Sequence, residues 1–280
     1  MTFSIAGRSA DGTQLGVAVA SKFLAVGNAV PAARAGVGAV ATQALANLAY
    51  RGHGLDLLAA GADADQVVAT VTGEDDQRDH RQLGVVGATG HGASYTGAEC
   101  FAWAGGRTGD GYALQGNILA GPEVVDAMET AWLDSAPTDP LVDRLLSALL
   151  AGDRAGGDRR GRQSAAVLVV SPGGGYGGGS DDLVDLRVDD HPDPVPELVR
   201  LRGLHELYFG QTDPAQWLPL RGALADETRD LLSAAGHPPA DDSEPALDGA
   251  LAAWAGVENL EERLGPGRID PVVLDQLRRR

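Results

Sequence analysis

The sequence predicts an α+β fold, because strand and helix patterns come in runs and do not alternate as regular βαβ units. Strand patterns come first, two helical patterns follow, strands return, and a second pair of helices precedes two further strands. Two β-sheets, each covered by a pair of helices, satisfy this order. The remainder of the 280-residue chain has helical patterns only, which predicts a small all-α module.

The strands are predicted from short apolar or alternating segments that are bounded by turn residues. The first two form a hairpin whose turn contains Asp11 and Gly12, a pair that favours tight turns. A glycine-rich loop at 172–179 joins the last two strands. The predicted strands cover residues 2–7, 15–20, 37–42, 82–88, 92–96, 112–117, 164–170 and 182–188.

The helices are predicted from their start and stop signals. In the first pair, Asp63 or Asp65 caps the second helix, since a carboxylate there accepts hydrogen bonds from the free N–H groups of the first turn. Pro122 and Pro140 open the second pair at positions where a missing N–H costs nothing.

A segment rich in proline and aspartate divides the chain. Prolines in such numbers disfavour both a helix and a central strand, which predicts a linker. Beyond it, leucines recur at helical spacing at positions 198, 201, 204 and 207. We therefore predict a domain of residues 1–190, a linker of residues 191–196 and a helical module of residues 197–280.

Bulk composition excludes several classes of protein. The formal net charge of −17 disfavours nucleic acid and anionic membranes as partners. A single cysteine rules out an internal disulfide, and the six histidines lack the spacing of metal ligands, so we expect no metal and no cofactor. No apolar run approaches about 20 residues and the start lacks a signal-peptide pattern. We therefore expect a cytoplasmic protein.

Thr2 is the first candidate for catalysis. Removal of Met1 would give Thr2 a free α-amine with a pKa near ~8, which can act as the base for its own hydroxyl. Many proteins nevertheless begin with Met-Thr and have no such chemistry. Lys22 is the only lysine among 22 basic residues. Close to Thr2, its ammonium would lower the pKa of the amine; otherwise it is an ordinary surface lysine.

Further polar residues follow strand ends or lie in loops. The Asn117 amide would donate to an oxyanion, and Gln43 and Asn47 allow the same interpretation, although each also fits a buried amide that bonds to a loop. The arginine-rich segment 158–162 would bind a carboxylate or form a solvated loop. Cys100 fits a small buried apolar residue. We assign catalysis to Thr2, Lys22 and Asn117, and substrate binding to Gln43, Asn47, Glu99, Arg159, Gln163 and Ser164.

Seven ordered blocks carry a family resemblance over residues 1 to ~190: 2–6, 16–22, 41–47, 95–100, 103–105, 115–121 and 157–166. They resemble the domain-of-unknown-function 1028 family. This resemblance implies the four-layer αββα sandwich of N-terminal nucleophile hydrolases, a wider group that includes proteasome-type subunits. The proteasome triad is not carried over. Lys22 follows Ser21 where those subunits have an acidic residue, and Arg34 is the nearest basic residue to the place of their lysine.

The helical module resembles, by its position and helical content, the peptidoglycan-binding module that is fused to this domain in other proteins. The leading hypothesis is a hydrolase of small amide or peptide-like substrates that uses Thr2. One alternative is a non-catalytic protein that binds a small molecule or a cell-wall fragment. Another is an assembly subunit, since such sandwiches often form homo-oligomers. The expected partners are therefore a small amide substrate and peptidoglycan fragments.

Overall fold

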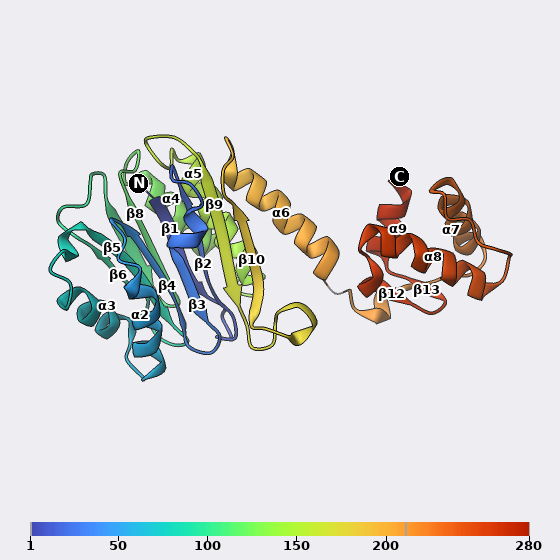
Figure 1. Ribbon diagram of the computed structural model, residues 1–280, viewed down its shortest axis with the longest axis horizontal. Coiled ribbons are helices and arrows are strands. Elements are labelled where there is room, and N and C mark those ends of the chain that lie inside the picture. The colour runs from blue at the N-terminus through green and yellow to red at the C-terminus, as the bar shows by residue number, and fades with distance from the viewer. Residues whose placement is uncertain (1, 211, 280) are drawn as a thin grey trace. The chain divides into compact units, whose positions relative to one another are not determined.

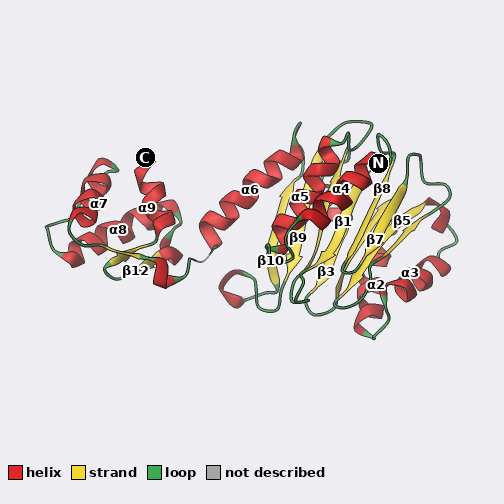
Figure 2. Cartoon of the chain, turned by 180° about the vertical axis from the view of Figure 1, so that it is seen from behind, coloured by secondary structure: helices red, strands yellow, loops and turns green. Residues whose placement is uncertain are grey.

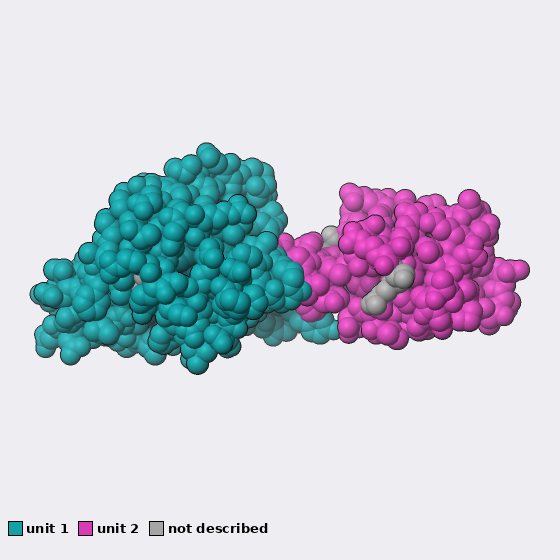
Figure 3. Space-filling model, turned by 90° about the horizontal axis from the view of Figure 1, so that it is seen from above, with its two compact units in different colours: residues 1–201 teal, residues 202–280 magenta. Residues whose placement is uncertain are grey.

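The computed structural model describes residues 2–210 and 212–279. Contacts between residues divide the chain into two compact units, residues 1–201 and 202–280 (Figure 3). The division falls within helix α6 (Pro194–Phe209) and not in the predicted linker. Whether the two units fold independently stays a prediction.

Unit 1 contains two antiparallel β-sheets (Figure 1). The six-stranded sheet has the order β10-β9-β2-β1-β8-β7, so β1 lies between β2 and β8 in its interior. The four-stranded sheet has the order β3-β4-β5-β6. The strands are β1 (Thr2–Arg8), β2 (Leu15–Ser21), β3 (Pro31–Arg34), β4 (Gly38–Ala44), β5 (Arg81–Gly87), β6 (Ala93–Thr96), β7 (Gly105–Gly109), β8 (Tyr112–Asn117), β9 (Ser164–Val170) and β10 (Asp182–Val188).

A pair of helices covers each sheet (Figure 2). Helices α4 (Glu123–Asp134) and α5 (Leu141–Arg154) pack on the six-stranded sheet, and α2 (Ala49–Ala59) and α3 (Ala64–Gly73) pack on the four-stranded sheet. Asp63, one of the two caps that the sequence offers, is the residue that caps α3, and it forms a capping box with Gln66. A single turn, α1 (Val26–Ala29), follows β2.

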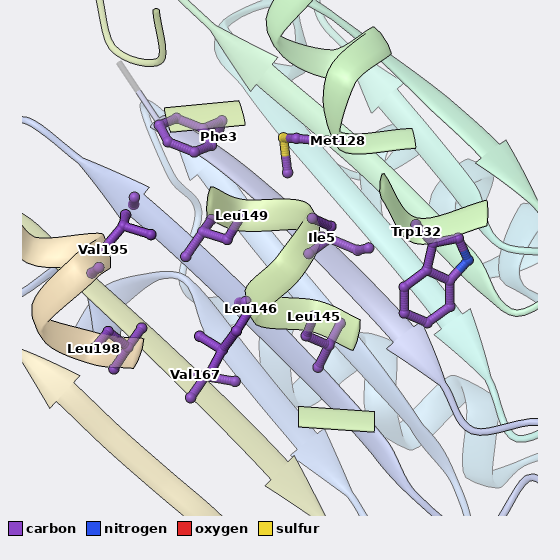
Figure 4. Packing of buried hydrophobic residues seen from close by; sticks show 14 of the residues in the cluster. Phe3, Ile5, Met128, Trp132, Leu145, Leu146, Leu149, Val167, Val195 and Leu198 are labelled. Carbon is purple, nitrogen blue, oxygen red and sulfur yellow. The ribbon is translucent and has the colours of Figure 1, made fainter. Parts of the chain in front are cut away.

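Large side chains fill the space between α5 and the six-stranded sheet. Leu145 and Leu149 of α5 lie over Phe3 and Ile5 of β1, and all four are buried (Figure 4). The opposite face of the same sheet meets the four-stranded sheet through smaller residues. This second cluster consists largely of Ala6, Val17, Val19, Ala39, Ala41, Val86 and Ala113. Small side chains allow the two sheets to approach closely, as the predicted pairing of the sheets requires.

In unit 1 each predicted strand has a counterpart, but two strands were missed. β3 is four residues long and begins with proline, and β7 is rich in glycine. Neither has the β-branched or aromatic residues that mark strands in a sequence. The expectation of a non-helical segment at 191–196 was wrong in part, because α6 begins at Pro194. Proline is tolerated in the first turn of a helix, and Val195 and Leu198 are buried in the core of unit 1.

Unit 2 is mainly helical, with α7 (Ala223–Ala234), α8 (Glu244–Glu258) and α9 (Pro271–Arg278). It also has a small three-stranded sheet, so the expectation of a purely α-helical module was wrong in this detail. Its strands are β11 (Leu218–Pro219), β12 (Leu264–Gly265) and β13 (Arg268–Ile269). Trp254 is buried in the core of this unit. Among the described residues, none of the helices has the length and hydropathy that a membrane span requires.

Candidate functional site

Thr2 is the first residue of β1, at one end of the six-stranded sheet. It pairs with Ser21, the last residue of β2, and with Asn117, the last residue of β8. The register of three neighbouring strands therefore brings the ends of three distant segments together. Met1, whose removal the sequence analysis expects, lies outside the described residues.

A cavity of about 430 Å³ opens beside Thr2, a volume in the usual range for small-molecule sites. Four residues predicted from the sequence line it: Thr2, Gln43, Glu99 and Asn117. Most of the other lining residues are apolar. The apolar ones are Phe23, Val26, Ala29, Val30, Ala44, Leu45, Ala46, Phe101 and Ile118. The remaining lining residues are Ser21, His80, Cys100 and Arg160.

The hydroxyl of Thr2 is almost completely buried and has a fixed neighbour. Its Oγ1 lies 3.0 Å from Oγ of Ser21, a hydrogen bond in which either hydroxyl can be the donor. Only 7% of Thr2 is exposed. The bond holds Oγ1 in one position at the cavity wall. Ser21 was missed as a site residue, because the predicted second strand ends at residue 20; the turn at Asp11 and Gly12, extended by one residue pair, was the signal for it.

Buried amides connect the two sheets directly below Thr2. Nε2 of Gln43 donates to the Thr2 carbonyl oxygen (3.2 Å) and to Oε1 of Gln82 (2.8 Å). The same Gln82 oxygen accepts a bond from Nδ2 of Asn117 (2.9 Å). Oε1 of Gln43 accepts a bond from the Ser4 hydroxyl (2.7 Å). Gln43 is thus committed to holding β1 against β4, whereas Asn117 uses one N–H and faces the cavity.

Two residues of the cavity wall have a left-handed backbone without being glycine. Ala44 has a φ of 68° and Ile118 a φ of 51°. This conformation costs of order 1–2 kcal/mol for a residue with a Cβ, and most of all for a β-branched one. Hydrogen bonds hold Ile118 in place, since its N–H donates to the Phe101 carbonyl (2.8 Å). Strained backbone of this kind is concentrated at functional sites.

Lys22 does not line the cavity. It is exposed, and its Nζ donates to the Arg162 carbonyl oxygen at 3.2 Å. Its backbone N–H donates to the buried Asp158 carboxylate at 2.6 Å. The structure therefore brings Thr2 and Asn117 together at the cavity and directs the Lys22 ammonium elsewhere.

The segment that follows Asp158 contributes one residue to the cavity, Arg160, which the sequence analysis had not singled out. Its guanidinium pairs with Asp158 (Nη2 to Oδ2, 3.3 Å). Arg159 and Gln163 do not line the cavity, and Gln163 bonds to Asp190 (3.2 Å). The sequence places three arginines in this loop and has no signal that shows which of them faces the cavity.

Ser164 is completely buried at the start of β9. Its hydroxyl donates to the Phe23 carbonyl (2.5 Å) and accepts a bond from the Val26 N–H (3.1 Å). These two bonds fix the segment that carries Phe23 and Val26 to the cavity. Ser164 therefore lies behind the cavity wall, where it supports residues that face the cavity.

Asn47 points into a second depression of about 460 Å³, away from Thr2. Its amide donates to Oδ2 of Asp75 (3.0 Å), which also accepts bonds from the Tyr50 hydroxyl (2.9 Å) and Nε of Arg81 (3.0 Å). The hydrogen bond with Arg81, followed by those with Asn47, Gln77 and Tyr50, holds the pKa of Asp75 well below its usual value.

Cys100 lines the cavity, but burial raises the pKa of its thiol. The thiol therefore stays protonated and is a poor nucleophile. Within residues 2–210 and 212–279, no group of three or more His, Cys, Asp or Glu side chains is arranged to hold a metal ion. Thr2 and Ser21 therefore supply the hydroxyl groups at this cavity.

The family model described as "Family of unknown function (DUF1028)" matches residues 2–198. The chain belongs to this family. A second model, described as "Putative peptidoglycan binding domain", matches residues 208–277. The DUF1028 match ends within α6, after the buried residues Val195 and Leu198, and every residue that lines the cavity lies within it.

A solved structure of another DUF1028 protein, from Silicibacter pomeroyi, is 29% identical, with a TM-score of 0.66. The similarity covers 81% of this chain and 92% of that one. The structure of Anbu (ancestral beta-subunit) from Yersinia bercovieri is 14% identical, with a TM-score of 0.33 over 75% of this chain and 98% of that chain, a likeness too slight to bear on function. None of the curated proteins matches.

Proposed function

We propose that this DUF1028 protein hydrolyses small amide or peptide-like substrates, with Thr2 as an N-terminal nucleophile after removal of Met1. The observation that carries this proposal is the place of the Thr2 hydroxyl. It lies at the wall of a cavity, at the first position of an interior strand, and is held by Ser21. Two sheets between two helix pairs are consistent with the αββα sandwich of N-terminal nucleophile hydrolases.

The first half of the proposed reaction forms an ester on Thr2. The α-amine of Thr2 takes the proton from Oγ1, and Oγ1 attacks the carbonyl carbon of the amide. The second N–H of Asn117 stabilises the negative charge on the tetrahedral oxygen, since the first N–H is held by Gln82. The C–N bond then breaks, and the ammonium of Thr2 returns the proton to the leaving amine.

The second half releases the acid. A water molecule gives a proton to the α-amine and attacks the ester carbon, the C–Oγ1 bond breaks, and Oγ1 takes the proton back. The Ser21 hydroxyl keeps Oγ1 oriented in both halves. Lys22 takes no direct part in either half of this proposal, because its ammonium is exposed and bonds to the Arg162 carbonyl.

The state of the amino terminus is tested by the mass of the purified protein. The proposal requires the loss of Met1, and an intact Met1 contradicts it. Hydrolysis of a panel of small amides is then compared in the wild type, Thr2→Ser and Thr2→Ala. We expect partial activity in Thr2→Ser and none in Thr2→Ala, with unchanged thermal unfolding in both. Full activity in a folded Thr2→Ala protein would refute the role of Thr2.

A second candidate function rests on the match at residues 208–277. We propose that this part of the chain binds cell-wall fragments. Sedimentation of the full chain with purified peptidoglycan tests it, with residues 1–201 as the control. Equal sedimentation of both proteins contradicts the proposal.

A further inference from the structure

The charges at the wall of the cavity are not balanced. Arg160 faces Asp158, whose side chain is only 2% exposed, so its positive charge is opposed by a buried carboxylate. Glu99 also lines the cavity, and its carboxylate has no hydrogen bond or ion pair within residues 2–210 and 212–279. Its backbone is nevertheless fixed, because its N–H donates to the Asp79 carbonyl (2.8 Å). Glu99 is therefore the acidic side chain at the cavity wall whose charge no described residue opposes.

Large apolar side chains line the same cavity as this carboxylate and are largely exposed to water. Phe23 is 54% exposed, Leu45 is 60% exposed and Phe101 is 72% exposed, and all three line the cavity. Covering them with an apolar group of a ligand is favourable. The aromatic faces of Phe23 and Phe101 also attract cations. Phe101 follows Glu99 by two residues, so both belong to one fixed loop.

We propose that the cavity binds amides that carry a protonated amine beside an apolar group, such as the amide of an apolar amino acid. Glu99 pairs with the amine, and Phe23, Leu45 and Phe101 cover the apolar group. The amide carbonyl is then left for Thr2 and Asn117. This inference deepens the proposed hydrolysis and rests on it for the fate of the ligand, but the binding itself does not depend on turnover.

Binding to the full-length Thr2→Ala protein, in which the proposed turnover is removed, tests the inference by titration calorimetry at about pH 7, where an α-amine with a pKa near ~8 is mostly protonated. Three probes share one phenyl group: L-phenylalaninamide has an amine, 3-phenylpropanamide lacks it, and 3-phenylpropanoate is an anion. We expect phenylalaninamide to bind about 10-fold more tightly than the neutral amide, the size of one charge-assisted contact.

Variants assign this preference to one residue. Glu99→Gln in the same background should reduce the difference between the two amides to about 2-fold, with the neutral amide bound as before. Glu74→Gln is the matched control, since Glu74 is exposed and lies in the other depression. It should keep the full preference.

The inference is overturned if the two amides bind equally, if the anion binds best, or if phenylalaninamide does not bind at about 10 mM, a concentration at which even weak ligands are seen. It is also overturned if Glu99→Gln keeps the preference. A failure of the hydrolase proposal would give a different result. Phenylalaninamide would then bind with the Glu99-dependent preference, but a wild-type protein that has lost Met1 would not hydrolyse it.

Discussion

Replacing Asp75 by alanine tests how the cavity wall next to Thr2 is held. The Asp75 carboxylate is 12% exposed and accepts bonds from Asn47, Tyr50 and Arg81 through one oxygen. Arg81 in turn donates to the Leu45 carbonyl (2.5 Å). The segment 45–47 is thus held at Leu45 by Arg81 and at Asn47 by Asp75. Loss of the Asp75 carboxylate therefore loosens both ends of the segment that places Leu45 at the cavity.

The size of the effect follows from these contacts. One hydrogen bond to a charged group contributes about 1.5–3 kcal/mol, and removal of one partner of a buried ion pair costs about 3–5 kcal/mol. Because the three bonds share one carboxylate and water can reach it, we expect Asp75→Ala to lower the free energy of unfolding by about 3 kcal/mol. Asp75→Asn keeps an acceptor and loses only the charge, so its cost is about 1–2 kcal/mol.

Urea unfolding measures both variants. With a slope near ~2 kcal/mol per M, Asp75→Ala should lower the midpoint by about 1.5 M. Asp76→Asn is the matched control, because Asp76 is the exposed neighbour. It should leave the midpoint unchanged within about 0.2 M. A shift below about 0.3 M for Asp75→Ala would refute the view that this carboxylate holds the segment.

The pH dependence gives an independent check. The pKa of Asp75 is lowered in the folded protein, chiefly by Arg81, from an ordinary value of 3.8. The unfolded chain therefore takes up this proton first as the pH falls. The contribution of the charge is complete at neutral pH and is lost progressively below about pH 4. The difference in stability between the wild type and Asp75→Asn should shrink over the same range.

Three further predictions concern packing. Gly84→Ala should lower the free energy of unfolding by about 1–3 kcal/mol, because its Cβ would lie 2.0 Å from the buried Gln115 amide; an unchanged urea midpoint contradicts this. Arg263→Ala should cost about 3–5 kcal/mol in the unfolding of unit 2, since Asp270 is completely buried and loses its ion pair; a normal transition of this unit speaks against it. Residues 1–201 should be soluble and folded, whereas residues 1–192 should be less stable by about 3–5 kcal/mol, since they lack two buried side chains of α6. Equal thermal unfolding of the two fragments would exclude that difference.

The sequence predicted the parts of the site that depend on strand order and register. Thr2 and Asn117 begin and end neighbouring strands, so their meeting follows once β1 and β8 pair. The direction of a side chain does not follow in this way. Lys22 lies one residue beyond Ser21, yet its ammonium bonds to the Arg162 carbonyl, because a loop far along the chain offers that acceptor.

The apolar residues that line the cavity were the largest omission from the sequence analysis. Phe23, Leu45 and Phe101 carry no chemical motif, and isolated apolar residues in loops are common on protein surfaces. Only the fold shows that three of them line one cavity. Similarly, the use of the Asn47 amide depends on Asp75, which is 28 residues away and belongs to no matching block.

The closely packed layer between the two sheets, which is mainly alanine and valine, has a consequence for how such proteins diversify. A larger side chain there would push the sheets apart and displace Thr2, so this layer resists change. Part of the cavity wall is made instead by loop residues between strands, such as Leu45, Phe101 and Ile118. The residues that line the cavity can therefore change through loop exchanges, while the scaffold that holds Thr2 stays the same. Members of one family would then share the arrangement around Thr2 and differ in the ligands that their cavities accept.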